Sequence, residues 1–100
     1  MAKRLFGTIT PNNTTATETE DYISVTLHRT EVFHHDKRAG VVTLRTGGWP
    51  TVTTKRRINE AFKAFLPGAF LWQQNHEWFV SYAGQILPFS SDVLTFKVAN

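Results

Sequence analysis

Residues 47–68 read GGWPTVTTKRRINEAFKAFLPG and contain the strongest secondary-structure pattern of the chain. Its apolar side chains recur at the spacing of one face of an amphipathic helix: Ile58, Ala61, Phe62 and Phe65. Thr53 or Thr54 is a suitable N-cap, because a threonine hydroxyl accepts a hydrogen bond from the unpaired amides of the first turn. Pro67 and Gly68 end the pattern. The segment therefore predicts the one clear helix of the chain.

The chain before this helix has the pattern of β-strands. From residue 22, the alternation of Ile23, Val25 and Leu27 with polar residues predicts a strand with one buried face. The alternation breaks at residues 29–31 and resumes at residue 32, which a one-residue bulge explains. This segment is therefore interpreted as one long, bulged strand.

Shorter segments complete the first half of the chain. We expect a strand over residues 2–9, a turn over residues 34–40 and a strand over residues 41–46 that closes a hairpin. Residues 10–21 are predicted to be a polar loop or mobile arm. Residues 10–19 hold no apolar side chain larger than alanine, so they bury too little surface to offset the entropy of ordering.

The chain after the helix predicts further strands. Residues 70–73 and 77–82 form a hairpin around residues 74–76, and residues 86–89 and 93–98 follow. The fold class is α+β, with an antiparallel or mixed sheet of about five to six strands, one amphipathic helix on one face and the order β-β-β-α-β-β-β. With 100 residues, the chain has room for one core and is expected to be a single domain.

Composition excludes several classes of protein. The absence of cysteine excludes disulfides, zinc–thiolate sites and thiol catalysis. An uncharged stretch such as residues 64–76 is too short and too polar to span a bilayer, which needs about 20 apolar residues. The basic N-terminus has no apolar segment after it and is not a secretory signal.

Positive charge is concentrated in the middle of the sequence. Residues 28–63 carry eight Lys or Arg side chains against three Asp or Glu side chains, and each flanking segment has one more acid than base. Lys55, Arg56 and Arg57 are expected in the first helical turn, where the macrodipole disfavours cations. Cations at a position where local electrostatics disfavours them are one indication of a functional site. Here the site would bind a phosphate or a carboxylate.

Helical geometry places these cations around the buried face. Arg56, Glu60 and Lys63 lie opposite Ile58, and Lys55 and Arg57 flank the apolar stripe. The cationic start of the helix is therefore expected to be open to solvent. The alternative is an ordinary solvated helix face, in which Arg56 and Glu60 pair at i,i+4.

Aromatic residues supply a second set of candidates. Trp49 lies beside the cations and can stack on an unpaired base, although packing over the core is favoured. Six phenylalanines are interpreted as core: Phe62, Phe65, Phe70, Phe79, Phe89 and Phe96.

Catalytic motifs are absent from the sequence. His34, His35 and Asp36 have no established metal-ligand spacing, and adjacent residues of an extended segment point to opposite faces. No serine lies in a GxSxG elbow, and there is no GxGxxG motif or P-loop. We expect neither an enzyme nor a bound metal or cofactor.

The segment GGWPTVTTKRRIN, residues 47–59, carries a family resemblance. Together with residues 77–80 (EWFV) and 87–89 (LPF), it resembles small proteins of tailed bacteriophages through the pattern GGWxTVTTKxRxN. The resemblance covers residues 27–94 and leaves residues 1–21 outside. It implies a phage product in the host cytoplasm, of a size class in which many proteins bind host factors or nucleic acid, and it names no catalytic residues.

Three functions therefore remain open. The first is a nucleic-acid-binding module, or one that binds another anionic surface. The second is a protein-binding module that inhibits a host enzyme or defence complex through an acidic surface, and the third is a virion component. An exposed edge strand would also allow a homodimer. The candidate site residues are Arg45, Trp49, Lys55, Arg56, Arg57 and Lys63.

Overall fold

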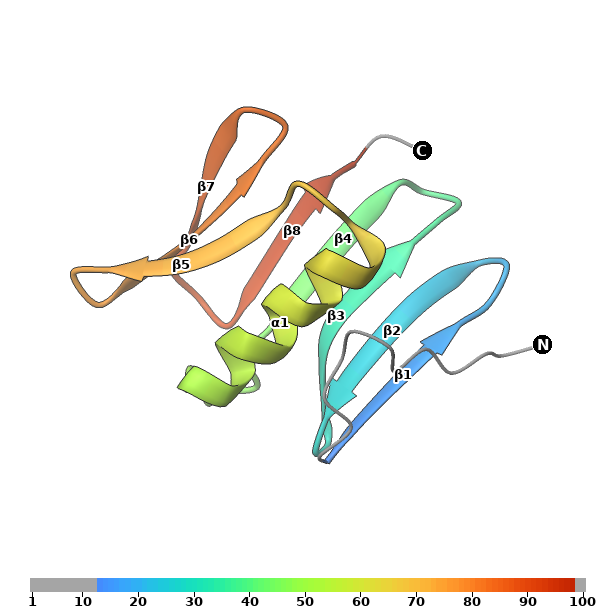
Figure 1. The fold of residues 1–100 in the computed structure, drawn as a ribbon, viewed down its shortest axis with the longest axis horizontal. Coiled ribbons are helices and arrows are strands. Elements are labelled where there is room, and N and C mark those ends of the chain that lie inside the picture. The colour runs from blue at the N-terminus through green and yellow to red at the C-terminus, as the bar shows by residue number, and fades with distance from the viewer. Residues whose placement is uncertain (1–12, 99–100) are drawn as a thin grey trace.

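The structure, a computed structural model, describes residues 13–98, which form eight strands and one helix (Figure 1). In chain order, the elements are β1 (Thr14–Glu18), β2 (Tyr22–Leu27), β3 (Thr30–Asp36), β4 (Val41–Arg45), α1 (Val52–Phe65), β5 (Phe70–Gln74), β6 (Glu77–Tyr82), β7 (Gln85–Phe89) and β8 (Val93–Lys97). The strand predicted over residues 2–9 lies outside the described residues.

The strands form two antiparallel sheets. The larger has the order β1-β2-β3-β4-β8 and the smaller the order β5-β6-β7. Helix α1 lies across one face of the larger sheet, with the smaller sheet next to it (Figure 1). The predicted α+β class and the single helix on a sheet face are confirmed, although two sheets replace the single sheet expected. Within residues 13–98, no helix has the length and apolar character needed to cross a membrane.

The core lies between α1 and the larger sheet. Ile58, Ala61 and Phe62 of the helix are buried, as the periodicity predicts. Phe62 meets Phe33 of β3 edge to face, with ring centroids 6.0 Å apart. Leu71 of β5 belongs to the same cluster, so the smaller sheet shares this core. Burial of apolar area at about 25 cal/mol per Å² is what holds the helix in place.

Helix α1 begins earlier than predicted. The N-cap is Thr51, whose Oγ1 accepts a hydrogen bond from the Thr54 amide at 3.2 Å. Lys55 therefore closes the first turn, and Arg56 and Arg57 lie in the second, beyond the reach of most of the macrodipole. The predicted end is confirmed, because the Leu66 amide donates the last helical hydrogen bond to Phe62 O at 2.8 Å.

The predicted loop or mobile arm over residues 10–21 is wrong for residues 14–18, which form β1, while residues 19–21 connect β1 to β2. This strand pairs with β2 along its whole length. Ala16 is fully buried opposite Val25, and Thr14 is buried opposite Leu27. A polar strand is stable here because β2 satisfies its backbone and two small side chains are enough to fit the core.

The break in the pattern comes from a hairpin turn at residues 28–29, so residues 22–33 belong to two strands, β2 and β3, and not to one. His28 turns the chain with a φ of 55°. A bulge does occur farther along, where the register shifts after Val25 and Val32 is the extra residue of β3. As a result, both Val32 and Phe33 are buried.

The smaller sheet contains the predicted hairpin and a second tight turn. Asn75 and His76 have φ values of 52° and 67°, and Ala83 and Gly84 have values of 51° and 78°. Two consecutive positive φ angles are the signature of the type I′ turn, whose twist matches that of paired strands. These turns make β5, β6 and β7 a compact meander next to the helix.

Candidate functional site

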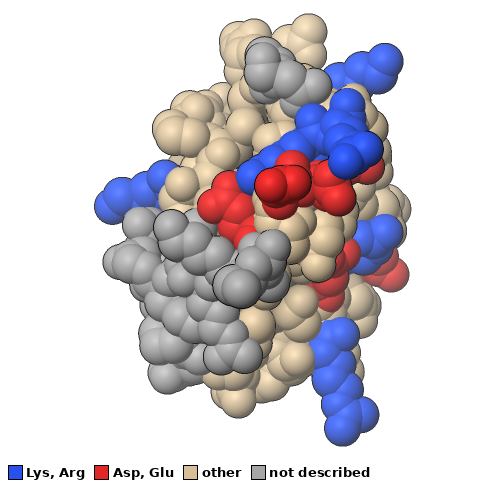
Figure 2. Space-filling view, turned by 90° about the vertical axis from the view of Figure 1, so that its right-hand side faces the viewer, with Lys and Arg blue, Asp and Glu red and all other residues tan. Residues whose placement is uncertain are grey.

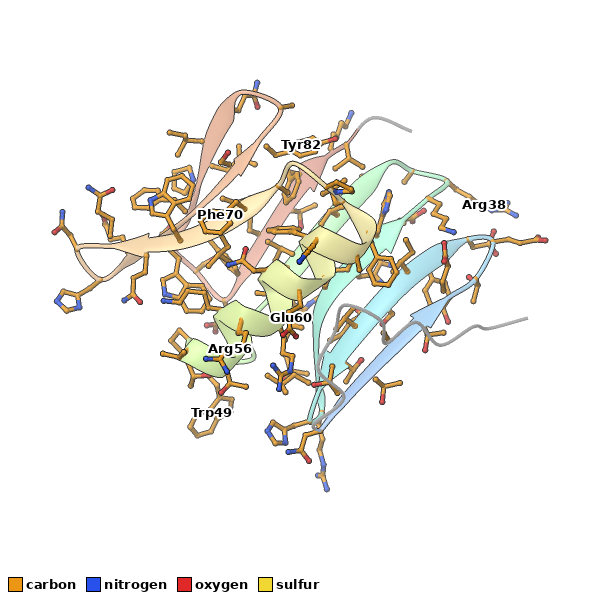
Figure 3. All side chains as sticks on the ribbon, in the orientation of Figure 1. Arg38, Trp49, Arg56, Glu60, Phe70 and Tyr82 are labelled. Carbon is orange, nitrogen blue, oxygen red and sulfur yellow. The ribbon has the colours of Figure 1, made fainter. Side chains whose placement is uncertain are left out.

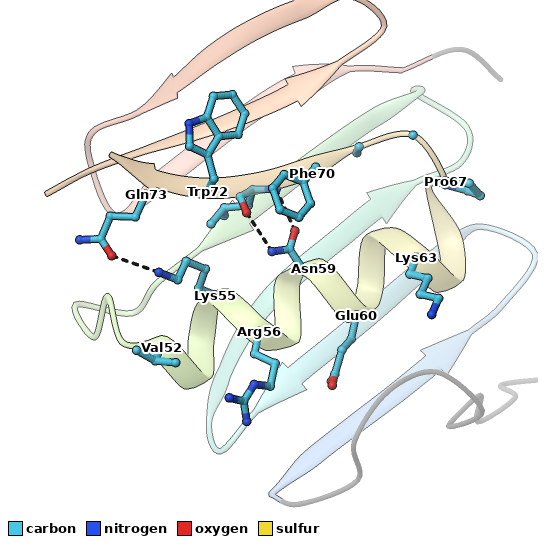
Figure 4. A pocket seen from close by; sticks show the side chains of 13 residues that line it. Val52, Lys55, Arg56, Asn59, Glu60, Lys63, Pro67, Phe70, Trp72 and Gln73 are labelled. Atoms are coloured by element: carbon cyan, nitrogen blue, oxygen red, sulfur yellow. Dashed lines mark hydrogen bonds between the residues drawn. The ribbon is translucent and has the colours of Figure 1, made fainter. Parts of the chain in front are cut away.

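A groove of about 910 Å³ runs between α1 and β5 (Figure 4). The helix contributes Lys55, Arg56 and Lys63 to its lining, and β5 contributes Phe70 and Trp72. Three of the six candidate residues from the sequence therefore line one groove, together with two aromatic residues of β5.

Asn59 joins the two walls of the groove. Its Nδ2 donates a hydrogen bond to Leu71 O at 2.9 Å, and its Oδ1 accepts one from the Leu71 amide at 2.8 Å (Figure 4). Strand β5 is an edge of the smaller sheet, so Asn59 satisfies backbone groups that have no neighbouring strand. The buried Leu71 side chain fixes the same point from below. The two walls of the groove are therefore held at a fixed position relative to each other.

Positive charge in the groove is not balanced by carboxylates. Arg56 and Lys63 are exposed and form no ion pair within residues 13–98. Glu60 lies on the same helix wall, but it pairs with Arg57 at 3.5 Å. Three cations and one carboxylate line the groove, which makes it electropositive.

Lys55 contacts neutral partners. Its Nζ donates a hydrogen bond to Gln73 Oε1 at 3.1 Å and lies 6.0 Å from the ring centroid of Trp78. Both partners orient the ammonium group without cancelling its charge. Lys55 is thus held toward β5 at Gln73, at the end of the groove near the start of the helix (Figure 4).

Arg57 does not face the groove, contrary to the sequence prediction. Its side chain is buried, with 5% of the residue exposed. Nε donates a hydrogen bond to Thr14 Oγ1 at 3.0 Å, and Nη1 lies 3.5 Å from Glu60 Oε1. Glu60, which the alternative interpretation pairs with Arg56, therefore pairs with Arg57. Arg57 fastens α1 to β1 and is excluded from the candidate site.

Trp49 and Arg45 also lie outside the groove. Trp49 is 71% exposed, so the expectation that it covers the core is wrong. It lines a smaller hollow of about 530 Å³ with Arg29 and the start of the helix. Arg45 is exposed on β4 and pairs with Glu31 at 3.5 Å.

The basic middle of the sequence does not form one basic surface. Lys37 pairs with Glu18 at 2.7 Å and Arg38 with Asp21 at 2.5 Å, across the turns that end β1 and β3. Arg38 lies at the opposite end of the molecule from Trp49 and Arg56 (Figure 3). On the face shown in Figure 2, cations and carboxylates are interspersed. The groove therefore holds only part of the positive charge of residues 28–63.

The adjacent histidines lie in β3 rather than in a turn, and they point to opposite faces of the sheet, as expected. His34 Nδ1 lies 2.9 Å from Glu31 Oε2, and its ring stacks on Tyr22. Both ring nitrogens of His35 are buried and have no hydrogen-bond partner. Burial, aided by the charge of Lys37, lowers the pKa of His35. Within residues 13–98, no group of three or more His, Cys, Asp or Glu side chains is placed to hold a metal ion.

The aromatic wall of the groove was missed by the sequence analysis. Phe70 was assigned to the core, but it is 56% exposed, and Trp72 is half-buried. The alternation of side chains in a strand could have indicated this exposure. Because Leu71 points to the buried face of β5, its neighbours Phe70 and Trp72 must point to the opposite face. Phe62 and Phe89 are buried, as predicted, and the other three phenylalanines assigned to the core are half-buried: Phe65, Phe79 and Phe96.

Comparison with known proteins identifies a family for this chain. The sequence model of a family described as Kyanoviridae Gp96 protein matches residues 6–96. This match extends the resemblance predicted for residues 27–94, and it includes most of the N-terminal segment that was expected to lie outside. No curated protein and no solved structure matches the chain.

Proposed function

Because the chain belongs to the Kyanoviridae Gp96 protein family, a family of bacteriophage proteins, we propose that it is a small non-enzymatic protein that binds nucleic acid in the host cytoplasm. The contacts are made to phosphates in the groove between α1 and β5. The cations that make them are Lys55, Arg56 and Lys63.

The observation that carries this proposal is the set of cations without carboxylate partners. Elsewhere in residues 13–98, most cations near the sheets are paired with acids, as Lys37, Arg38 and Arg45 are. In the groove, by contrast, Arg56 and Lys63 face solvent. Phosphate contacts release condensed counterions from nucleic acid, which supplies affinity without base-specific readout. An arginine fork and a lysine point charge both suit phosphate oxygens.

The test is the salt dependence of oligonucleotide binding. Fluorescence anisotropy with a labelled oligonucleotide at several NaCl concentrations gives the slope of log Kd against log salt. Each lost phosphate contact changes that slope by about 0.7 to 0.9, so R56Q/K63Q should reduce it by about 1.4 to 1.8. The control R38Q/K97Q removes the same charge away from the groove and should leave the slope near that of the wild type. Equal slopes for wild type and R56Q/K63Q would exclude the proposal.

A protein partner is the second candidate. Ile86 is 65% exposed on β7, and large exposed apolar side chains favour protein contacts. An acidic surface of a host enzyme or defence complex would suit the groove cations. Capture from infected-cell extract after nuclease treatment distinguishes this candidate, because one host protein would then be retained without nucleic acid. Peptides of this chain in purified virions would instead indicate a virion component.

A further inference from the structure

We propose that the groove selects single-stranded over double-stranded nucleic acid, with bases stacking on Phe70 and Trp72 while phosphates contact the cations of α1. This inference rests on the proposed function and specifies its ligand.

The first step is the aromatic wall. Phe70 and Trp72 lie two residues apart on β5, so their side chains leave the same face of the strand. Their rings are nearly parallel, with centroids 6.4 Å apart and an interplanar angle of 13°. Trp72 also stacks on Phe79 of β6, at 5.7 Å and 28°. The smaller sheet thus carries a row of three aromatic rings, and its end at Phe70 is open to solvent.

The second step is that this wall is rigid. The double hydrogen bond from Asn59 holds the β5 backbone at Leu71, directly between the two rings. Phe79 supports Trp72 from the neighbouring strand. Aromatic side chains that are already ordered lose little conformational entropy when they bind a ligand.

The third step is the position of the charges. Lys55, Arg56 and Lys63 line the groove from α1, and Phe70 and Trp72 line it from β5. In Figure 4, Lys55 extends to Gln73, whereas the Arg56 and Lys63 side chains extend from the helix into solvent on the side away from β5. Eight residues of helix separate Lys55 from Lys63, which is about 12 Å at 1.5 Å per residue. A strand that crosses the exposed surface of α1 and β5 can therefore meet the cations of the helix and the exposed ring of Phe70.

The fourth step concerns the ligand. A duplex keeps its bases stacked inside the helix and offers phosphates at its surface, so it can use the cations but not the rings. A single strand has bases free to stack, and base–aromatic stacking contributes about 1–3 kcal/mol per base. The pairing of a cationic wall with an aromatic wall therefore favours the single strand.

The experiment measures anisotropy of labelled single-stranded oligo(dT) and of a duplex of equal length. The wild type should bind the single strand more tightly. Phe70→Leu should weaken single-strand binding by roughly 5- to 150-fold, as for one lost stacked base, and leave duplex binding unchanged. Phe70→Tyr keeps a ring face and should retain affinity. Ile86→Ala is the matched control, since Ile86 is also exposed on the smaller sheet but does not line the groove.

The outcomes separate this inference from the proposed function. Equal wild-type affinity for both ligands, or F70L binding the single strand within twofold of wild type, overturns the inference and leaves phosphate binding intact. Binding of neither ligand overturns both. Light scattering supplies a further readout, because a dimer that F70L dissociates would make the aromatic wall a protein interface and overturn the inference. An unchanged melting temperature for F70L ensures that a loss of binding is not a loss of fold.

Discussion

Replacing Arg57 with alanine tests whether this side chain supports the fold or serves a ligand. Its guanidinium donates to Thr14 Oγ1 at 3.0 Å and lies 3.5 Å from Glu60 Oε1, and the residue is 5% exposed. Hydrogen bonds that involve a charged group contribute about 1.5–3 kcal/mol, and the buried methylenes of the side chain add about 1–2 kcal/mol. Relief from burying a charge offsets part of this sum. We expect Arg57→Ala to lower the free energy of unfolding by about 2–4 kcal/mol, against a total of about 5–15 kcal/mol for a domain.

Equilibrium unfolding in urea measures this effect. The midpoint should fall while the m-value stays constant, since the surface exposed on unfolding hardly changes. Arg56→Ala is the matched control, because Arg56 is the exposed neighbour on the same helix and should lose less than about 0.5 kcal/mol. An Arg57→Ala protein as stable as the wild type, with a reduced salt slope for oligonucleotide binding, would refute the structural role.

Three further perturbations test the fold and the groove. Burial favours the neutral form of His35, so its pKa in the folded protein lies below the ordinary value of 6.5. The contribution of His35 to the free energy of unfolding should therefore be constant above pH 6.5 and decrease as the pH falls below that value. Urea unfolding midpoints of His35→Leu should lose this pH dependence. Asn59→Ala removes both hydrogen bonds to the β5 backbone. We expect thermal unfolding to show a loss of about 1–3 kcal/mol in the free energy of unfolding, and hydrogen exchange at the Leu71 amide to become faster. An unchanged exchange rate would contradict the role of Asn59 in holding β5. Gly47 and Gly48 both have positive φ, but a Cβ at Gly47 would lie 2.4 Å from Thr30 Oγ1, whereas a Cβ at Gly48 would meet no neighbouring atom. Gly47→Ala should therefore lower the free energy of unfolding by about 1–2 kcal/mol more than Gly48→Ala. Equal losses for the two variants would contradict the packing of Gly47 against Thr30.

The helix and the late hairpins could be predicted from the sequence because their signals are local. The apolar spacing from Ile58 to Phe65 determines one helix face without reference to the rest of the chain. Strand β1 gave no such signal, because its stability comes from pairing with β2 and from the fit of Ala16. The turn between β2 and β3 was also hidden, because His28 adopts a positive φ without a glycine.

The candidate site was predicted in part for the same reason. Helical geometry places Arg56 and Lys63 away from the core, and the structure agrees. The burial of Arg57 depends on Thr14, which is distant in sequence, so helical geometry alone leaves it at the border of the apolar face. The partnership of α1 with Phe70 likewise requires the position of β5, which Asn59 sets through side-chain contacts.

The most direct test of the groove as the binding site is an NMR titration of the ¹⁵N-labelled protein with single-stranded oligo(dT). Binding in the groove predicts the largest amide shifts at residues 55–63 and 70–73, with small changes at residues 36–39 on the distant turn. Shifts centred on residues 28–30 and 49–54 would place the ligand in the hollow at Trp49 and contradict the account.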